Sequence, residues 1–156
     1  MTLASFNAAP AAQARAAMLA CCGSTRFADA MTAGRPYASL SAAERAAQAV
    51  LAAMTWDEVR EGLDGHPRIG ARVAGVSAAE QSGVGDESRA ALAAGNAAYE
   101  ERFGYVFLIC ATGLSGDQLL AALRLRLAHD ELSERVVAAA ELGKITVLRL
   151  RKELAG

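Results

Sequence analysis

The sequence has little histidine, little cysteine and almost no excess of either charge. Its 156 residues include 2 histidines and 3 cysteines, and none of these is spaced as a cluster of metal ligands. The 16 basic and 17 acidic residues are interspersed and leave a net charge of −1. The sequence therefore has no cluster of basic residues of the kind that binds a phosphate backbone. No P-loop or dinucleotide-binding fingerprint is present. We therefore expect no metal, no nucleotide cofactor and no nucleic acid.

Long hydrophobic runs are also missing, and so are targeting signals. No stretch approaches the roughly 18 uncharged apolar residues that a membrane span needs. The N-terminal segment has no basic region ahead of a continuous apolar core, and the ending "RKELAG" is not a peroxisomal tripeptide. Adjacent cysteines such as Cys21 and Cys22 rarely form a disulfide, so a reducing compartment fits best. These features predict a cytoplasmic protein without a membrane partner.

What the sequence does contain is alanine, leucine, glutamate and arginine in helical patterns. A hydrophobic fraction of 53% with 21% charged residues is typical of a globular protein. A chain of this length is most simply one domain, residues 1–156, that buries about two thirds of its unfolded surface. Because the abundant residues favour helices, we predict an all-α, single-domain helical bundle. The expected helical segments are 11–24, 40–54, 55–65, 85–104, 115–129 and 130–156.

Start and stop signals support these helices. Ser41 with Glu44 has the capping-box pattern, and Gly65 follows the segment that begins near Thr55 or Asp57. In residues 85–104, one helical face carries four residues at spacings of three and four, namely Leu92, Asn96, Tyr99 and Phe103. We expect Tyr99 and Phe103 in the core and Asn96 as a buried amide with a structural role.

The apolar run "YVFLICATG", residues 105–113, does not fit a helix. Its residue types favour a strand, yet no second convincing strand exists to pair with it, and a lone strand cannot satisfy its backbone groups. The run predicts a short, extended, buried segment near 105–111, or a distorted helix start. Its main-chain groups would then be available to a ligand.

His66 lies between Gly65 and Pro67, a setting that suits the presentation of an imidazole. Proline disfavours the helical region for the residue before it, so His66 should be extended and outside a helix. Its side chain can change protonation near neutral pH, but a hydrogen-bonded loop histidine is an equally open interpretation. His129 precedes Asp130 at a helix junction, where a capping role is expected.

The stretch "SAAEQ", residues 77–81, allows two interpretations. A capping box at Ser77 and Glu80 would explain it, since "SAAE" also occurs at 41–44. Alternatively, Glu80 and Gln81 lie in a first helical turn, near N–H groups that suit an anionic ligand, and Glu80 shares proton transfer with His66. Arg149 has the same ambiguity: it is either a solvated side chain or an inward guanidinium for a carboxylate or ureido oxygen.

Taken in order, these segments resemble the 2-oxo-4-hydroxy-4-carboxy-5-ureidoimidazoline (OHCU) decarboxylases of the urate-to-allantoin pathway. The resemblance covers nearly the whole chain, and its ordered set of motifs is more specific than any one of them. The segments that carry it are "GRPYAS", "SLSAAERAAQ", "HPRIG", "SAAEQ", "NAAYEERFGYVFLICATG" and "RLRLAHDELSERVVAAAELGKITVLRL".

The resemblance implies an all-helical homodimer that decarboxylates OHCU to (S)-allantoin without metal or organic cofactor. It implies His66 as the catalytic acid/base with Glu80 beside it. Many relatives have an acidic residue where this chain has Arg68, so Arg68 is given no role. The substrate-binding residues that the resemblance implies are Pro67, Ser77, Gln81, the backbone of Phe107, Leu108, Ile109, Cys110 and Ala111, and the side chain of Arg149.

Two other functions remain open on the sequence alone. A cofactor-free hydrolase or isomerase acting on a related ureide would use the same pair, His66 and Glu80. A helical ureide-binding or regulatory module would have no catalysis, and "SAAEQ" would only cap a helix.

Overall fold

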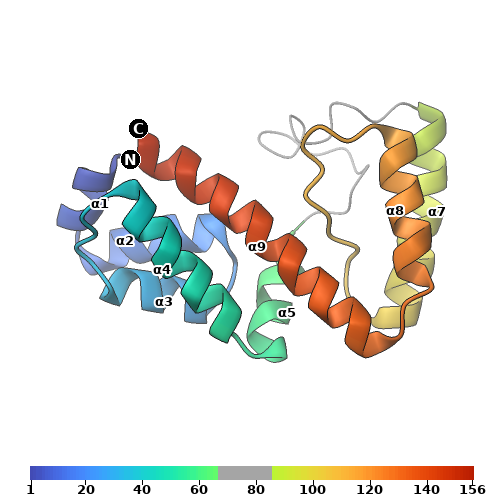
Figure 1. Cartoon of the computed structure of the whole chain (residues 1–156), viewed down its shortest axis with the longest axis horizontal. Coiled ribbons are helices and arrows are strands. Elements are labelled where there is room, and N and C mark those ends of the chain that lie inside the picture. The colour runs from blue at the N-terminus through green and yellow to red at the C-terminus, as the bar shows by residue number, and fades with distance from the viewer. Residues whose placement is uncertain (67–85) are drawn as a thin grey trace. The chain divides into compact units, whose positions relative to one another are not determined.

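A computed structural model describes residues 1–66 and 86–156, with side chains from residue 88 in the second range. Within these ranges the regular structure is helical, which confirms the predicted all-α class (Figure 1). The chain divides into two compact units, Met1–Gly65 with Leu142–Gly156 and His66–Glu141, and each is described by itself. The single-domain assignment stays a prediction. The helices are α1 (Leu3–Ala8), α2 (Ala11–Cys21), α3 (Thr25–Ala33), α4 (Leu40–Ala53), α5 (Trp56–Asp64), α7 (Asp86–Phe103), α8 (Gly116–Leu127) and α9 (Glu131–Ala155).

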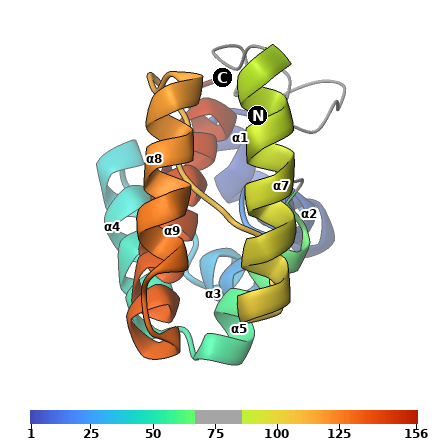
Figure 2. The ribbon, with the colours of Figure 1, turned by 90° about the vertical axis from the view of Figure 1, so that its right-hand side faces the viewer.

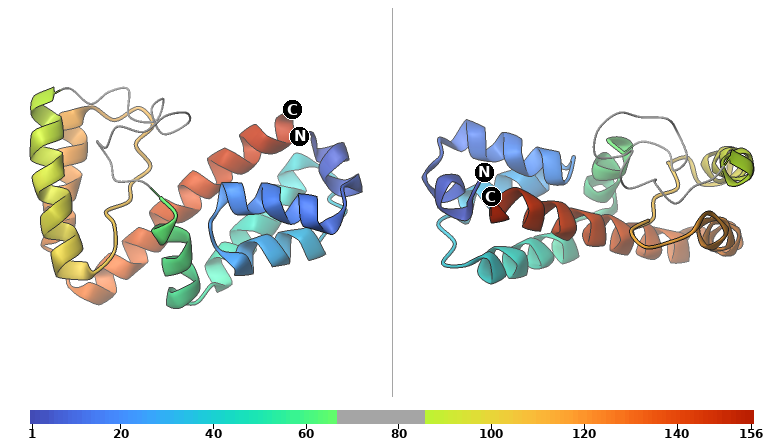
Figure 3. Two further views of the ribbon diagram at one scale, coloured as in Figure 1. Left: turned by 180° about the vertical axis from the view of Figure 1, so that it is seen from behind. Right: turned by 90° about the horizontal axis from the view of Figure 1, so that it is seen from above.

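The first unit packs α1 to α5 with the second half of α9. Helices α2 and α3 lie side by side (Figure 3). Gly62 of α5 allows a close approach, because a Cβ there would lie 2.9 Å from Leu142 Cδ2 and 3.3 Å from Cys22 Sγ. The largest side chains in this core are fully buried, and they are Phe6, Met18, Phe27, Met31, Leu63, Leu142 and Leu150.

Side chains, rather than helix packing alone, hold the loop after α3. Arg35 precedes a cis peptide bond to Pro36 and donates to the carbonyls of Phe6 at 2.7 Å and Ala9 at 2.8 Å. Asn7 and the backbone of Tyr37 exchange two hydrogen bonds of 2.9 Å. The "GRPYAS" segment is thereby bonded to the end of α1.

The second unit is built on α7 and α8, which lie side by side (Figure 2). The predicted face of α7 is buried: Leu92, Asn96, Tyr99 and Phe103 are each at most 8% exposed. Helix α8 approaches closely at Gly95, where an added Cβ would clash with Leu123. The periodicity therefore predicted the core face of α7 correctly, including its buried amide.

Helix starts were predicted with mixed success. Thr55 with Glu58 and Ser115 with Gln118 form complete capping boxes, and Thr55 is one of the two expected starts of its segment. The prediction for Ser41 is wrong: α4 begins at Leu40, two residues earlier than a Ser41 cap implies, and its N-cap is Ser39, whose hydroxyl accepts the Ala42 N–H at 3.1 Å. Ser39 is extended at φ −155° and ψ 165°, as an N-cap must be, so Ser41 already lies inside the helix. Helices α1 and α3 were not predicted.

This correction can be tested with two neighbouring serines. Ser39→Ala removes the cap and should lower the free energy of unfolding by about 0.5–2 kcal/mol. Ser41→Ala should be neutral or slightly stabilising, since Ser41 is exposed within α4 and alanine is the better helix former. Urea denaturation of both variants measures the difference. Equal losses in the two would contradict Ser39 as the cap.

The cysteines of the first unit are free, buried thiols. Cys21 is 2% exposed and Cys22 is fully buried. Burial raises the pKa of Cys21 from 9.0 to about 12 and also raises that of Cys22, while the nearby positive charge of Arg149 acts in the opposite direction. Both thiols are therefore protonated and unreactive at neutral pH.

Alkaline pH should destabilise the protein through Cys21. Between pH 9 and 12 the unfolded state has lost the thiol proton and the folded state still binds it, so stability falls as pH rises, by up to about 1.4 kcal/mol per pH unit. Cys21→Ala should flatten this dependence, as measured by urea denaturation at about pH 8 and about pH 10.5, on either side of the ordinary thiol pKa. Parallel profiles for the two proteins would rule out the effect.

Candidate active site

Only some of the predicted site residues can be placed. Pro67, Ser77, Glu80 and Gln81 lie outside the described residues, as does Arg68. His66, the segment Phe107–Ala111 and Arg149 are described. The pairing of His66 with Glu80 therefore stays a prediction.

His66 is a buried polar residue, 8% exposed. It follows Gly65, which ends α5 as its C-cap with φ −81° and ψ −7°. The helix thus stops where the glycine signal predicted, and His66 lies outside it. A buried imidazole is shielded from bulk water, and this is a suitable setting for directed proton transfer.

The apolar run after α7 is irregular and buried, as predicted. Gly104, with φ 82°, ends α7, and Gly113, with φ 80°, turns the chain toward α8. Both positions favour glycine because other residues rarely adopt positive φ. Between them Phe107, Leu108, Ile109 and Ala111 are each at most 8% exposed. This segment presents a stretch of non-helical backbone inside the unit.

Side chains of α8 and α9 anchor this backbone. Arg126 donates through Nη1 to the Leu108 carbonyl at 2.5 Å, and Glu141 accepts the Cys110 N–H at 3.2 Å. The Ala111 carbonyl accepts the Leu114 N–H at 3.0 Å. We expected the main-chain groups of this segment to be available to a ligand, but several of them form hydrogen bonds within the protein. These hydrogen bonds hold the segment in one conformation.

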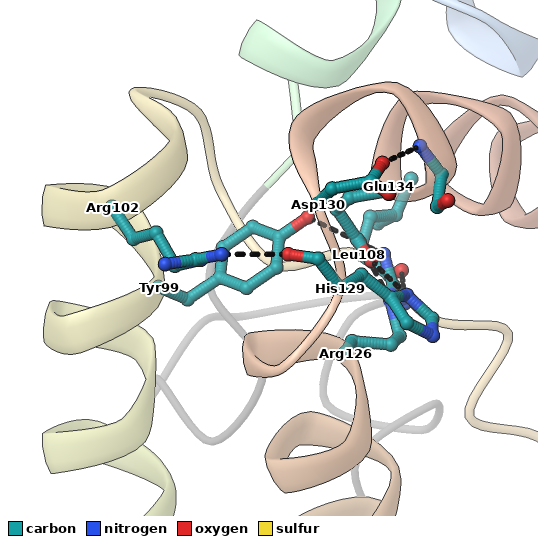
Figure 4. Close-up of polar contacts among 8 residues, drawn as sticks. Tyr99, Arg102, Leu108, Arg126, His129, Asp130 and Glu134 are labelled. Carbon is teal, nitrogen blue, oxygen red and sulfur yellow. Dashed lines mark hydrogen bonds and ion pairs between the residues drawn. The ribbon is translucent and has the colours of Figure 1, made fainter.

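Arg126 belongs to a buried polar cluster around Glu134 (Figure 4). Glu134 is fully buried, and its Oε1 atom lies 2.7 Å from Arg126 Nε and 2.5 Å from the hydroxyl of Tyr99. Its Oε2 atom lies 3.0 Å from His129 Nδ1. A buried carboxylate needs such partners, because without them its desolvation would cost several kcal/mol.

Burial determines the protonation state of Tyr99 in this cluster. Burial, together with the hydrogen bond to Glu134, raises the pKa of the Tyr99 phenol well above its ordinary value, so Tyr99 remains a donor. The Arg126 guanidinium lies over the Phe107 ring at 4.5 Å and over the Tyr99 ring at 5.7 Å. The cluster thus joins α7, α8, α9 and the irregular segment.

Sequence reasoning missed Arg126, Glu134 and Glu141. A signal for Arg126 was present, since Leu119, Leu123 and Arg126 follow the i, i+4, i+7 spacing of a buried face. His129 lies at the junction after α8, as expected. Its imidazole pairs with Glu134, and its carbonyl accepts from Arg102 at 2.7 Å.

Arg149 differs from its neighbour Arg151 in exposure. Arg151 is exposed and pairs with Glu44, with 2.7 Å between Arg151 Nε and Glu44 Oε1. Arg149 is only partly exposed, and its charge acts on the pKa values of the buried thiols Cys21 and Cys22. A role for Arg149 toward a substrate stays a prediction.

These features define an all-α protein with a buried histidine and with an irregular backbone segment that side chains anchor. Its residues 7–151 match the family model described as OHCU decarboxylase. The chain belongs to this family. Individual relatives and solved structures are more specific than this family match.

Two relatives are similar in sequence. The chain is 33% identical over 144 residues to "Uric acid degradation bifunctional protein TTL" of Arabidopsis thaliana, a match that covers 85% of this chain and 44% of that protein. It is 43% identical over 56 residues to "2-oxo-4-hydroxy-4-carboxy-5-ureidoimidazoline decarboxylase" of Amia calva, covering 36% of this chain and 32% of that one. The matches thus span less than half of the length of each of these relatives.

Two solved structures are similar in fold. One is described as an OHCU decarboxylase in the presence of (S)-allantoin, with a TM-score of 0.81, 30% identity, and coverage of 88% of this chain and 96% of that chain. The other, an (S)-allantoin synthase, has a TM-score of 0.73 at 21% identity, covering 99% of this chain and 54% of that one. The second likeness shows the fold alone.

Proposed function

We propose that this protein decarboxylates OHCU to (S)-allantoin in urate degradation, without metal or organic cofactor. The observation that carries the proposal is the likeness to an OHCU decarboxylase structure obtained with (S)-allantoin, at a TM-score of 0.81 over 96% of that chain. The family match over residues 7–151 supports the same reaction. The roles of individual residues rest on the resemblance of the sequence motifs.

The substrate can lose CO₂ without an external electron sink. Its ring carbon C4 carries a hydroxyl and a carboxylate, and the neighbouring C5 is an imine carbon bearing the ureido group. When the C4–carboxylate bond breaks, its electron pair forms a C4=C5 double bond, and the imine nitrogen takes up a proton. The intermediate then gains a proton at C5 and loses the hydroxyl proton at C4, which gives allantoin. One proton is consumed overall.

The task left to the protein is orientation and delivery of a proton to one face of C5. In this proposal His66 and Glu80 handle the substrate hydroxyl and the incoming proton. The Phe107–Ala111 backbone, with Pro67, Ser77, Gln81 and Arg149, binds the ring and ureido oxygens. The burial of His66 and of Phe107 supports a water-poor setting, which favours conversion of a charged carboxylate to neutral CO₂.

The test follows three signals from freshly prepared OHCU: CO₂, ammonia and circular dichroism. The decarboxylase should accelerate CO₂ release and produce the dichroism of one allantoin enantiomer, because the uncatalysed reaction gives both. A ureide hydrolase would release ammonia instead. A binding module would leave the rate and the enantiomer ratio of the spontaneous reaction unchanged, and either result would overturn the proposal.

We further propose that the protein is a cytoplasmic homodimer. The resemblance supports the dimer, and the free state of Cys21, Cys22 and Cys110 fits a reducing compartment. A membrane-spanning helix is absent from the part of the chain that the structure describes. Analytical ultracentrifugation tests the dimer, and a monomer at micromolar concentration would contradict it.

A further inference from the structure

The buried guanidinium of Arg126 makes more contacts than an ion pair requires. Its Nε and Nη2 atoms lie 2.7 and 2.6 Å from Glu134 Oε1, and Nη1 donates to the Leu108 carbonyl. Its central carbon lies 4.5 Å from the centre of the Phe107 ring. The group therefore holds both a backbone atom and a side chain of the irregular segment.

Stability alone does not account for an arginine and a glutamate at these positions. Burying two charges costs desolvation energy that the attraction between them only about offsets, and a well-packed apolar pair is often as stable. An apolar pair, however, cannot supply a hydrogen-bond donor with a fixed direction. Arginine supplies several donors in one rigid plane, which a flexible lysine ammonium does not.

The two anchors on either side of Ile109 determine the direction of its backbone groups. Arg126 holds the carbonyl of Leu108, and Glu141 holds the N–H of Cys110. The described peptide bonds are trans except at Arg35–Pro36, and in a trans peptide the C=O and N–H point in opposite directions. The Ile109 N–H therefore points away from Arg126, and the Ile109 carbonyl points away from the Glu141 carboxylate.

We propose that Arg126, assisted by Glu141, is a positioning residue for the reaction. It fixes the peptide groups of Ile109 as one donor and one acceptor, a pair that matches the C=O and N–H groups of a ureide. Arg126 itself does not touch the substrate. This inference rests on the proposed function, because it assumes that the Phe107–Ala111 backbone binds OHCU.

The test compares Arg126→Lys with Arg102→Lys. Arg102 is an exposed control in the same unit: its guanidinium also donates to a backbone carbonyl, that of His129 at 2.7 Å, and lies over an aromatic ring, that of Phe103 at 5.0 Å. Its carbonyl partner is outside the Phe107–Ala111 segment. The readouts are kcat/KM and the enantiomeric excess of newly formed allantoin at increasing enzyme concentration.

Arg126→Lys should lower kcat/KM by about 10- to 100-fold, and its enantiomeric excess should level off below that of the wild type. Added enzyme compensates for an unfolded fraction but not for a misplaced backbone, so a lower plateau identifies positioning. Arg102→Lys should reach the wild-type plateau. If Arg126→Lys also reaches it with unchanged kcat/KM, the proposal is wrong.

Glu141 provides a second pair of variants if Arg126→Lys does not fold. Glu141→Gln keeps an oxygen acceptor for the Cys110 N–H and should retain most of the plateau, whereas Glu141→Leu should lower it. Equal plateaus for these two variants would overturn the proposal. A wild-type protein that forms no enantiomeric excess would instead refute the proposed function, so the two failures are distinguishable.

Discussion

Replacing His66 with asparagine should abolish the stereoselective formation of allantoin. Asparagine can still form hydrogen bonds, but it cannot exchange a proton near neutral pH as an imidazole does. The loss of an acid/base group typically costs about 10²- to 10⁴-fold in rate, and a similar fall in kcat is expected. The remaining allantoin should be racemic, because the spontaneous reaction then dominates. Circular dichroism during turnover measures both effects.

The second histidine provides the control for this variant. His129 is partly exposed and pairs with Glu134, so His129→Asn should cost stability but leave the enantiomer ratio unchanged. Far-ultraviolet dichroism and urea denaturation confirm that each variant is folded. If His66→Asn keeps the enantiomeric excess of the wild type, His66 is not the acid/base group.

Glu134→Leu should destabilise the protein more than the loss of a helix cap does. It leaves the Arg126 charge, which is 6% exposed in its side chain, buried without the carboxylate 2.6 Å away. Breaking a buried pair in this way costs about 3–5 kcal/mol. It also removes the acceptor of the Tyr99 hydroxyl. Urea denaturation should show the loss as a lower midpoint.

The double variant Arg126→Met with Glu134→Leu separates a lost partner from lost packing. With both charges gone, no buried charge is left unpaired, so the part of the loss that the unpaired charge causes should return. Its catalytic efficiency should stay low, because the Leu108 carbonyl has lost its arginine donor. A double variant as unstable as Glu134→Leu would show that the unpaired charge does not cause the loss.

Local patterns were sufficient to predict most of the helices. The spacing of Leu92, Asn96, Tyr99 and Phe103 identified a buried face, and the capping residue Thr55 marked the start of α5. Ser39 and Ser41 show the limit of such patterns, because two serines two residues apart can both be read as caps. Only the backbone conformation decides between them.

Features of the candidate site that depend on neighbouring residues could be predicted from the sequence. Features that depend on burial in the folded protein were missed. Proline after His66 and the lack of a partner strand for residues 105–111 could be read from neighbouring residues. Arg126 and Glu134 were not singled out from the sequence. The helical spacing signals only that Arg126 lies on a buried face, and nothing in the sequence places Glu134 beside it. Folding brings them together from α8 and α9 around the irregular segment.

A crystal structure of the protein with (S)-allantoin is the most direct test of the proposed site. It should show the ureide within hydrogen-bond distance of the His66 imidazole and of the backbone between Phe107 and Ala111, with Arg126 still bonded to the Leu108 carbonyl. A ureide bound elsewhere, with no atom near His66 or this segment, would contradict it.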